Sequence, residues 1–156
     1  MKKKLLPFDT FQVAEVELVY RSKVKASDRP QIITSYDAYQ IFLQNWDPGK
    51  IELLEQFRVL YLNRASRVLG LFHASSGGIT GTVADPRLIL ATALRLNAVS
   101  LLLSHNHPSG ALQPSQADRE LTTKIRAAGM TLDIRVLDHL IISCDGYFSF
   151  ADEGLL

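Results

Sequence analysis

Two histidines, His105 and His107, end an apolar run in the stretch "LLLSHNHPSGALQPSQADRE" at residues 101–120. Side chains at positions i and i+2 of an extended chain point to the same side, so both imidazoles can face one cleft. A "PSG" turn follows, and then come Ser115 and Asp118. Two imidazoles and a carboxylate are a ligand set of catalytic zinc sites, which keep a further position for water. The spacing therefore predicts a zinc site made by His105, His107 and Asp118.

Ser115 and Asp118 also fit a structural interpretation. Ser-x-x-Asp is a capping box, in which the serine caps a helix and the acid three residues later bonds back to the serine N–H. Taken alone, such a pair is more often a helix cap than part of a metal site. The combination with His-x-His and a seven-residue spacing is rare by chance in a chain of this length and favours the metal site. The two roles of Ser115 can coexist.

Strand patterns surround this stretch. Strands are predicted over residues 55–62 and 67–74, joined as a hairpin by "NRAS", and over residues 98–104, which are continuously apolar like a central strand. Two or three more strands are expected over residues 132–151, with a tight turn at "DG". With the helices between them, these strands predict a mixed α/β domain with a central mixed sheet flanked by helices.

Capping residues predict where the helices begin and end. A helix is expected over residues 36–46, capped by Thr34 or Ser35, with Ile41, Phe42 and Trp46 on its inner side. A second is expected from the Asp85-Pro86 start to about Asn97. A third is expected from about Gln116 to Ala128, with Gly129 as its terminator.

Composition limits the classes of protein to which the chain can belong. The 156 residues are 47% hydrophobic and 21% charged, which is typical of a globular domain. Seventeen Lys and Arg against 16 Asp and Glu give a formal charge of +1, which does not favour a nucleic-acid partner. Apolar runs are too short for a membrane span of roughly 20 residues, and "MKKKLLPF" is not followed by the apolar stretch of a signal peptide.

The cysteine count and the first residues add two expectations. A single cysteine, Cys144, excludes an internal disulfide and fits a reducing cytoplasm. Residues 1–30 are interpreted as an N-terminal strand and linker, and residues 31–156 as the main domain. Edge strands at either terminus would allow a dimer but do not require one, so both a monomer and a dimer are compatible with the sequence.

The four residues His105, His107, Ser115 and Asp118 resemble the signature of JAMM (MPN/JAB) metalloprotease-like domains. The segments "SHNHPSG", "PSQADRELT", "DIRVLDHLII" and "YFSFADEGLL" are similar to the bacterial RadC subfamily. The resemblance runs from about residue 55 to residue 156. It implies a JAB/MPN-like layered architecture related to that of cytidine deaminases, with zinc bound by the two histidines and the aspartate.

The same resemblance implies two catalytic residues. The family's serine helps to hold the water and the tetrahedral intermediate, which assigns this role to Ser115. A glutamate before an early strand acts as general acid and base, and in "LEQFRVLYLN" this is Glu55, with Glu52 as its nearest competitor. The helix-hairpin-helix region usual in RadC-like chains is not evident in the first 30 residues.

Three functions follow as hypotheses. The first is a zinc metallohydrolase, a metallopeptidase of the JAMM type, that cleaves a peptide or isopeptide-like amide in a protein or peptide substrate. The second is a catalytically silent JAMM-fold module that binds a partner in DNA repair or mobile-element functions, with His73 as a candidate fourth ligand. The third, a nucleic-acid hydrolase, is disfavoured by the charge.

Three remaining residues are interpreted as structural. His73 lies at a strand end, and His139 stands beside Asp138 in a strand, where an Asp-His pair resembles a proton relay but has no nearby nucleophile. Cys144 adjoins a turn, where a thiol is exposed and not activated. The "GGITGT" loop lacks the lysine and spacing of a phosphate loop and is interpreted as a mobile segment able to order a substrate strand.

Overall fold

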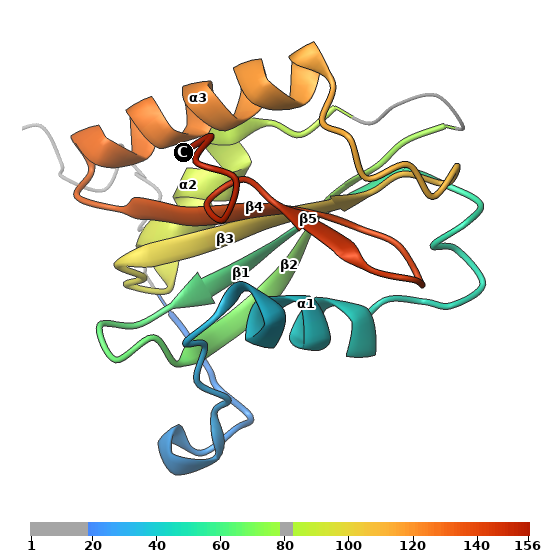
Figure 1. Cartoon of the computed structure of the whole chain (residues 1–156). Coiled ribbons are helices and arrows are strands. Elements are labelled where there is room, and N and C mark those ends of the chain that lie inside the picture. Colours follow the sequence, from blue (N-terminus) through green and yellow to red (C-terminus); the bar gives the residue numbers. More distant parts are fainter. Residues whose placement is uncertain (1–18, 79–82) are drawn as a thin grey trace, which may run out of the picture.

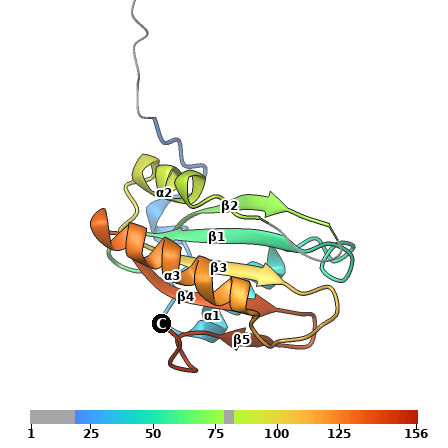
Figure 2. The same cartoon turned by 90° about the horizontal axis from the view of Figure 1, so that it is seen from above.

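A computed structural model describes residues 19–78 and 83–156. Within this part of the chain, five strands form one sheet in the order β2-β1-β3-β4-β5 (Figure 2). The central strand β3 pairs antiparallel with β1 and parallel with β4, so the sheet is mixed, as the sequence predicts. The strands are β1 (Gln56–Leu62), β2 (Val68–Ser76), β3 (Ser100–Asn106), β4 (Arg135–Ile142) and β5 (Tyr147–Ser149).

Helices cover both faces of the sheet. Helix α1 (Ser35–Gln44) lies on one face, and α2 (Pro86–Arg95) and α3 (Gln116–Thr131) lie on the other (Figure 1). Each interface is an apolar core. The core under α1 includes Phe42, Leu60 and Leu102, and the core under α2 and α3 includes Val59, Leu103 and Ile125. This layered mixed α/β arrangement confirms the predicted fold class and is consistent with a JAB/MPN fold.

The N-termini of the helices follow the predicted capping chemistry. Thr34 caps α1 in a capping box with Asp37, which decides between the two candidate caps. Asp85 accepts a hydrogen bond from the N–H of Arg87, and Pro86 occupies the first turn of α2. Both helices therefore begin where the local sequence satisfies their free N–H groups.

The predicted hairpins and central strand are also confirmed. Strands β1 and β2 pair antiparallel across the "NRAS" connection, and every residue of β3 is buried. The C-terminal segment forms two strands, β4 and β5, which pair antiparallel. The N–H of Ser143 donates to the carbonyl of Gly146 at 2.9 Å and closes the turn between them.

The prediction that Gly129 terminates α3 is wrong, because the helix continues to Thr131. The residue with positive φ is Asp133 (φ 55°), and the N–H of Ile134 donates back to the Gly129 carbonyl at 2.9 Å. Glycine is required at position 129 for another reason. A Cβ atom there would lie 2.6 Å from the carbonyl oxygen of Ile134, where the chain folds back over the helix.

Two expectations fall partly or wholly on residues whose structure is not described. The predicted N-terminal strand lies mainly within residues 1–18, and residues 79–82 belong to the "GGITGT" loop; both lie outside the described residues. The described part of the linker contains a short 3₁₀ helix, Ala26–Asp28. Among the described helices, none has the length and apolar character needed to cross a membrane.

We expect Gly129→Ala to destabilise the protein, although alanine is normally the better helix former by about 1 kcal/mol. The added methyl group would force the main-chain carbonyl of Ile134 to shift, at a cost of roughly 1–3 kcal/mol. Urea unfolding measures the change in the free energy of unfolding. Gly146→Ala is the control, because the atom nearest to its Cβ would be the Leu112 Cδ1 at 3.8 Å. Equal or greater stability of Gly129→Ala would contradict this account of the turn.

Candidate metal centre

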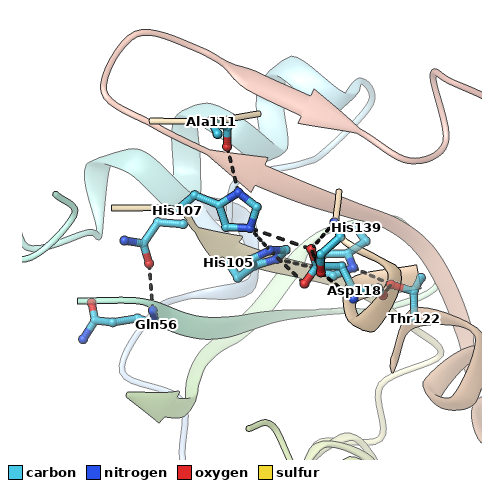
Figure 3. Close-up of polar contacts among 9 residues, drawn as sticks. Gln56, His105, His107, Ala111, Asp118, Thr122 and His139 are labelled. Carbon is cyan, nitrogen blue, oxygen red and sulfur yellow. Dashed lines mark hydrogen bonds and ion pairs between the residues drawn. The ribbon is translucent and has the colours of Figure 1, made fainter. Parts of the chain in front are cut away.

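The two histidines of the "SHNH" motif come together at the end of the central strand. His105 is the last but one residue of β3, where it pairs with Phe57 of β1, and its side chain is buried. His107 is the first residue after the strand. The Nε2 atoms of the two imidazoles lie 2.9 Å apart (Figure 3). Both rings therefore point to the same side, as the i, i+2 spacing predicts.

Asp118 reaches the same point from the first turn of α3. Its Oδ1 lies 3.2 Å from the Nε2 of His105, and its Oδ2 lies 3.7 Å from the Nε2 of His107. One ligand atom from each of the three residues can be chosen so that all lie within 4.8 Å of one another. Among the described residues this is a three-member cluster, and His73 is not part of it. The geometry thus brings together the three residues that the sequence predicts as ligands.

The outer nitrogens of both rings are already bonded to the protein. The Nδ1 of His107 lies 2.8 Å from the carbonyl oxygen of Ala111, and the Nδ1 of His105 lies 2.8 Å from the Nε2 of His139. Because a carbonyl only accepts, the His107 Nδ1 carries the proton, and in the neutral ring Nε2 is then a bare acceptor. A metal-binding histidine is held in this way, with one nitrogen bonded to the protein and the other free for the ion.

The donor set fits a divalent cation. The free lone pair of His107 points at a second imidazole and at a carboxylate over distances of 2.9 and 3.7 Å. Groups that only accept repel one another at such separations unless a proton or a metal ion lies between them. Among the residues that the structure describes, the cluster thus offers two imidazoles and one carboxylate to a metal ion.

The groups of the cluster also shift one another's pKa values. Burial on its own raises the pKa of the Asp118 carboxyl, but the adjacent imidazoles of His105 and His107 and the Ser115 hydroxyl outweigh burial and hold that pKa well below its usual range. The Asp118 carboxylate in turn raises the pKa of His107, against the effect of burial. Asp118 is therefore ionised at neutral pH, as a metal-binding carboxylate must be.

Ser115 is the N-cap of α3 and orients Asp118. Its N–H and its Oγ both donate to the Asp118 Oδ2, each at 2.7 Å, and its Oγ accepts from the Asp118 N–H at 3.2 Å. The capping box is thus present, and it fixes Oδ2 while Oδ1 faces His105. To donate to a substrate, the Ser115 hydroxyl would have to turn away from Asp118, so its predicted catalytic role stays a prediction.

Glu55 lies immediately before β1 and is half-buried. Its carbonyl accepts from the N–H of Gly77 at 2.8 Å, which ties its backbone to the end of β2. Because Phe57 pairs with His105, the period of two places Glu55 on the His105 side of the sheet. The charge of Glu55 contributes to the raised pKa of His107, so its carboxylate lies within electrostatic reach of the cluster. Its competitor, Glu52, is exposed.

Asn106, between the two histidines, fixes the segment that carries Glu55, and the sequence did not reveal this role. Its side chain is buried and points to the opposite side from His105. The Asn106 Nδ2 donates to the carbonyls of Ile51 and Leu54 at 2.6 and 2.8 Å, and its Oδ1 accepts from the N–H of Gln56 at 2.8 Å. These bonds clamp the backbone on both sides of Glu55. The available signal was an amide side chain between the two histidines, at the end of a largely apolar strand.

His139, interpreted from the sequence as structural, contacts the cluster through its ring, and the adjacent Asp138 carboxylate bonds to other groups. The Asp138 carboxylate accepts from the Ser149 hydroxyl, from the Ala151 N–H and from the backbone N–H of His139. The His139 ring instead bonds to His105 and to Thr122.

The other two residues interpreted as structural lie apart from the cluster. The side chain of His73 is exposed on β2, whose register pairs it with Arg58 of β1. Cys144 is exposed and free, as predicted.

Replacing Asn106 with alanine is expected to lower the free energy of unfolding by about 1–3 kcal/mol, because it leaves buried main-chain groups without partners. Hydrogen exchange at the Gln56 amide should accelerate as well. Ser104→Ala is the matched control: Ser104 lies on the same face of β3, and within the described structure its buried Oγ has no hydrogen-bond partner. Chemical denaturation and amide exchange measure both effects. Equal losses in the two variants would mean that the Asn106 bonds contribute nothing specific.

Comparison with known proteins places this geometry in a family. The sequence model described as "RadC-like JAB domain" matches residues 32–155. A relative named UPF0758 protein from Flavobacterium johnsoniae is 50% identical over 101 residues, which are 65% of this chain and 44% of that protein. A UPF0758 protein from Histophilus somni is 39% identical over 138 residues, which are 88% of this chain and 61% of that protein.

A third relative, the UPF0758 protein of Acidovorax ebreus, is 35% identical over 144 residues, which are 92% of this chain and 60% of that protein. The chain thus spans about half the length of the curated relatives that it matches. The names of these relatives state no activity. The match of the family model over most of the chain, together with the layered fold, identifies the chain as a member of the RadC-like JAB domain family.

Proposed function

We propose that this chain is a zinc-dependent hydrolase of the JAMM type that cleaves an amide bond in a peptide or isopeptide-linked substrate. The observation that carries the proposal is the convergence of two imidazole Nε2 atoms and one carboxylate on a single point. Membership in the RadC-like JAB domain family supports it.

Zinc is the metal that best suits this donor set. Imidazole nitrogen together with carboxylate oxygen is a usual zinc environment, whereas Mg²⁺ and Ca²⁺ prefer oxygen ligands alone. A structural zinc site usually has four protein ligands, and the cluster offers three among the described residues. The donor set therefore favours a catalytic role over a purely structural one.

Each residue of the site has a distinct task in the proposed reaction. His105, His107 and Asp118 hold the metal. A bound Zn²⁺ would polarise the substrate carbonyl and make water acidic near pH 7. Glu55 takes a proton from the attacking water and delivers it to the leaving nitrogen, which avoids the release of an unstable amide anion.

Ser115 has two tasks in this proposal. In the resting site its hydroxyl holds the Oδ2 of Asp118 at 2.7 Å. During the reaction the same hydroxyl turns to donate to the oxygen on which negative charge develops. The second task requires the first hydrogen bond to break, so Ser115 contributes to orientation and to rate in different states of the site.

The overall charge favours a protein or peptide substrate over nucleic acid. With a formal net charge of +1, the chain lacks the excess of positive charge that phosphate backbones attract. A single cysteine is compatible with action in a reducing cytoplasm, which is part of this proposal.

Glu55→Gln tests the mechanism. The amide keeps the shape of the side chain and cannot accept a proton, so zinc content should stay at one ion per chain while turnover falls by roughly 10²–10⁴-fold. Metal content is measured by inorganic mass spectrometry. Activity is measured with quenched fluorescent peptides and with peptides linked through a lysine ε-amide, and double-stranded DNA is tested in parallel.

Glu52→Gln is the matched control, because it makes the same change on an exposed residue of the same segment. It should leave activity unaltered. If Glu52→Gln abolishes turnover and Glu55→Gln does not, Glu55 is not the proton carrier. If the zinc-loaded wild type cleaves no amide substrate, the catalytic proposal fails and a binding module becomes the better account. DNA cleavage without amide cleavage would overturn the substrate class.

A further inference from the structure

A line of hydrogen bonds behind the metal site joins two of the three ligand residues. The Nδ1 of His105 lies 2.8 Å from the Nε2 of His139, and the Nδ1 of His139 lies 2.6 Å from the Oγ1 of Thr122. The Thr122 hydroxyl lies 2.5 Å from the backbone carbonyl of Asp118, one turn earlier in α3. Figure 3 shows these residues lined up from β3 through β4 to the helix.

The carbonyl of Asp118, at the end of this line, determines which atom donates and which accepts in each hydrogen bond. The carbonyl oxygen of Asp118 can only accept, so the single hydroxyl proton of Thr122 must be donated to it. The Thr122 oxygen then accepts from His139, which places a proton on the His139 Nδ1. The opposite arrangement would bring two acceptor oxygens together at 2.5 Å without a proton between them.

The direction of these hydrogen bonds also determines which nitrogens of His139 and His105 carry protons. His139 is completely buried, and in the described structure its ring bonds only to His105 and Thr122, so no carboxylate is bonded to the ring to stabilise a second proton. The neutral ring has its one proton on Nδ1, so its Nε2 accepts from the Nδ1 of His105. In neutral His105 this leaves Nε2 without a proton, and that nitrogen faces Asp118.

We propose that Thr122 and His139 are positioning residues that select the tautomer of His105 and so determine which nitrogen it offers to a metal ion. This inference rests on the metal site proposed above. Without the Thr122 hydroxyl, a proton on the His139 Nδ1 has no partner, and the ring gains by moving that proton to Nε2. His105 must then accept at Nδ1 and carry its own proton on Nε2, where it blocks the metal.

Packing holds His139 in the orientation that this relay needs. Its ring stacks on Phe150 with centroids 4.8 Å apart and an interplanar angle of 18°, and it lies 5.4 Å from the ring of Phe57. These aromatic neighbours restrict the plane of the imidazole and offer no alternative hydrogen-bond partner. The Thr122 hydroxyl is therefore the group that holds the proton on the Nδ1 of His139.

The test compares three threonine variants of the full chain. Thr122→Val removes the hydroxyl while keeping the shape, and Thr122→Ser keeps the hydroxyl. Thr123→Val is the matched control, because the Thr123 hydroxyl makes the same bond to the carbonyl four residues earlier but on the exposed side of the helix. The dissociation constant for Zn²⁺ is measured by competition with a chromophoric chelator. Long-range ¹H–¹⁵N NMR of the metal-free protein reports which imidazole nitrogens carry protons.

We expect wild type, Thr122→Ser and Thr123→Val to bind Zn²⁺ alike and to show His105 and His139 protonated on Nδ1. Thr122→Val should bind roughly 10–100-fold more weakly, the usual effect of losing a residue that supports a metal ligand. Its NMR spectrum should show both protons moved to Nε2.

Three results would overturn the relay: a wild-type His105 without a proton on Nδ1, an unchanged spectrum in Thr122→Val, or an unchanged dissociation constant in that variant. The wild-type spectrum decides the issue even if Thr122→Val fails to fold. Because the tautomers are read without metal or substrate, failure of the relay is distinguishable from failure of the hydrolase proposal, which shows as a wild type that binds no Zn²⁺ or cleaves no amide.

Discussion

The alternation of side chains at the end of β3 is the constraint on which the rest of the site depends. His105 and His107 point to the α3 side, and Asn106 points to the other side, where it fixes the backbone on both sides of Glu55. Because the period of a strand is two, a slip of one residue would exchange these faces and dismantle the ligand pair and the clamp together. Pairing with β1 on one edge and β4 on the other prevents such a slip.

Helix α3 shows how one local motif can serve both structure and chemistry. Its capping box, Ser115 with Asp118, satisfies the N-terminus of the helix and also presents a carboxylate to two histidines. Helix α1 begins with the same kind of box, Thr34 with Asp37, and no metal-ligand cluster includes that aspartate among the described residues. A capping box alone therefore does not make a metal site. The box of α3 contributes to one because it faces the end of β3, where the two histidines lie.

The sequence predicts well what depends on local spacing. The helix caps and the two hairpins are set by neighbours within a few positions, and the structure confirms them. It also brings the predicted ligands His105, His107 and Asp118 together. Asn106 and His139 depend on contacts with segments distant in the sequence, and Gly129 depends on the way the chain folds back at Ile134. A bulge in β4 accounts for His139: Leu101 pairs with Val136 but Leu102 pairs with Asp138, so the alternation of inward and outward residues shifts by one. Strict alternation would have placed His139 on the face opposite to Val136.

The central claim is that His105, His107 and Asp118 hold a catalytic metal ion. Anomalous diffraction at the zinc edge from crystals of the zinc-loaded protein tests it most directly. The account predicts one zinc ion per chain, bound by the Nε2 atoms of both histidines, by the Asp118 carboxylate and by a solvent molecule on the side of Glu55. A fourth protein ligand in place of solvent, or zinc bound elsewhere on the chain, would contradict it.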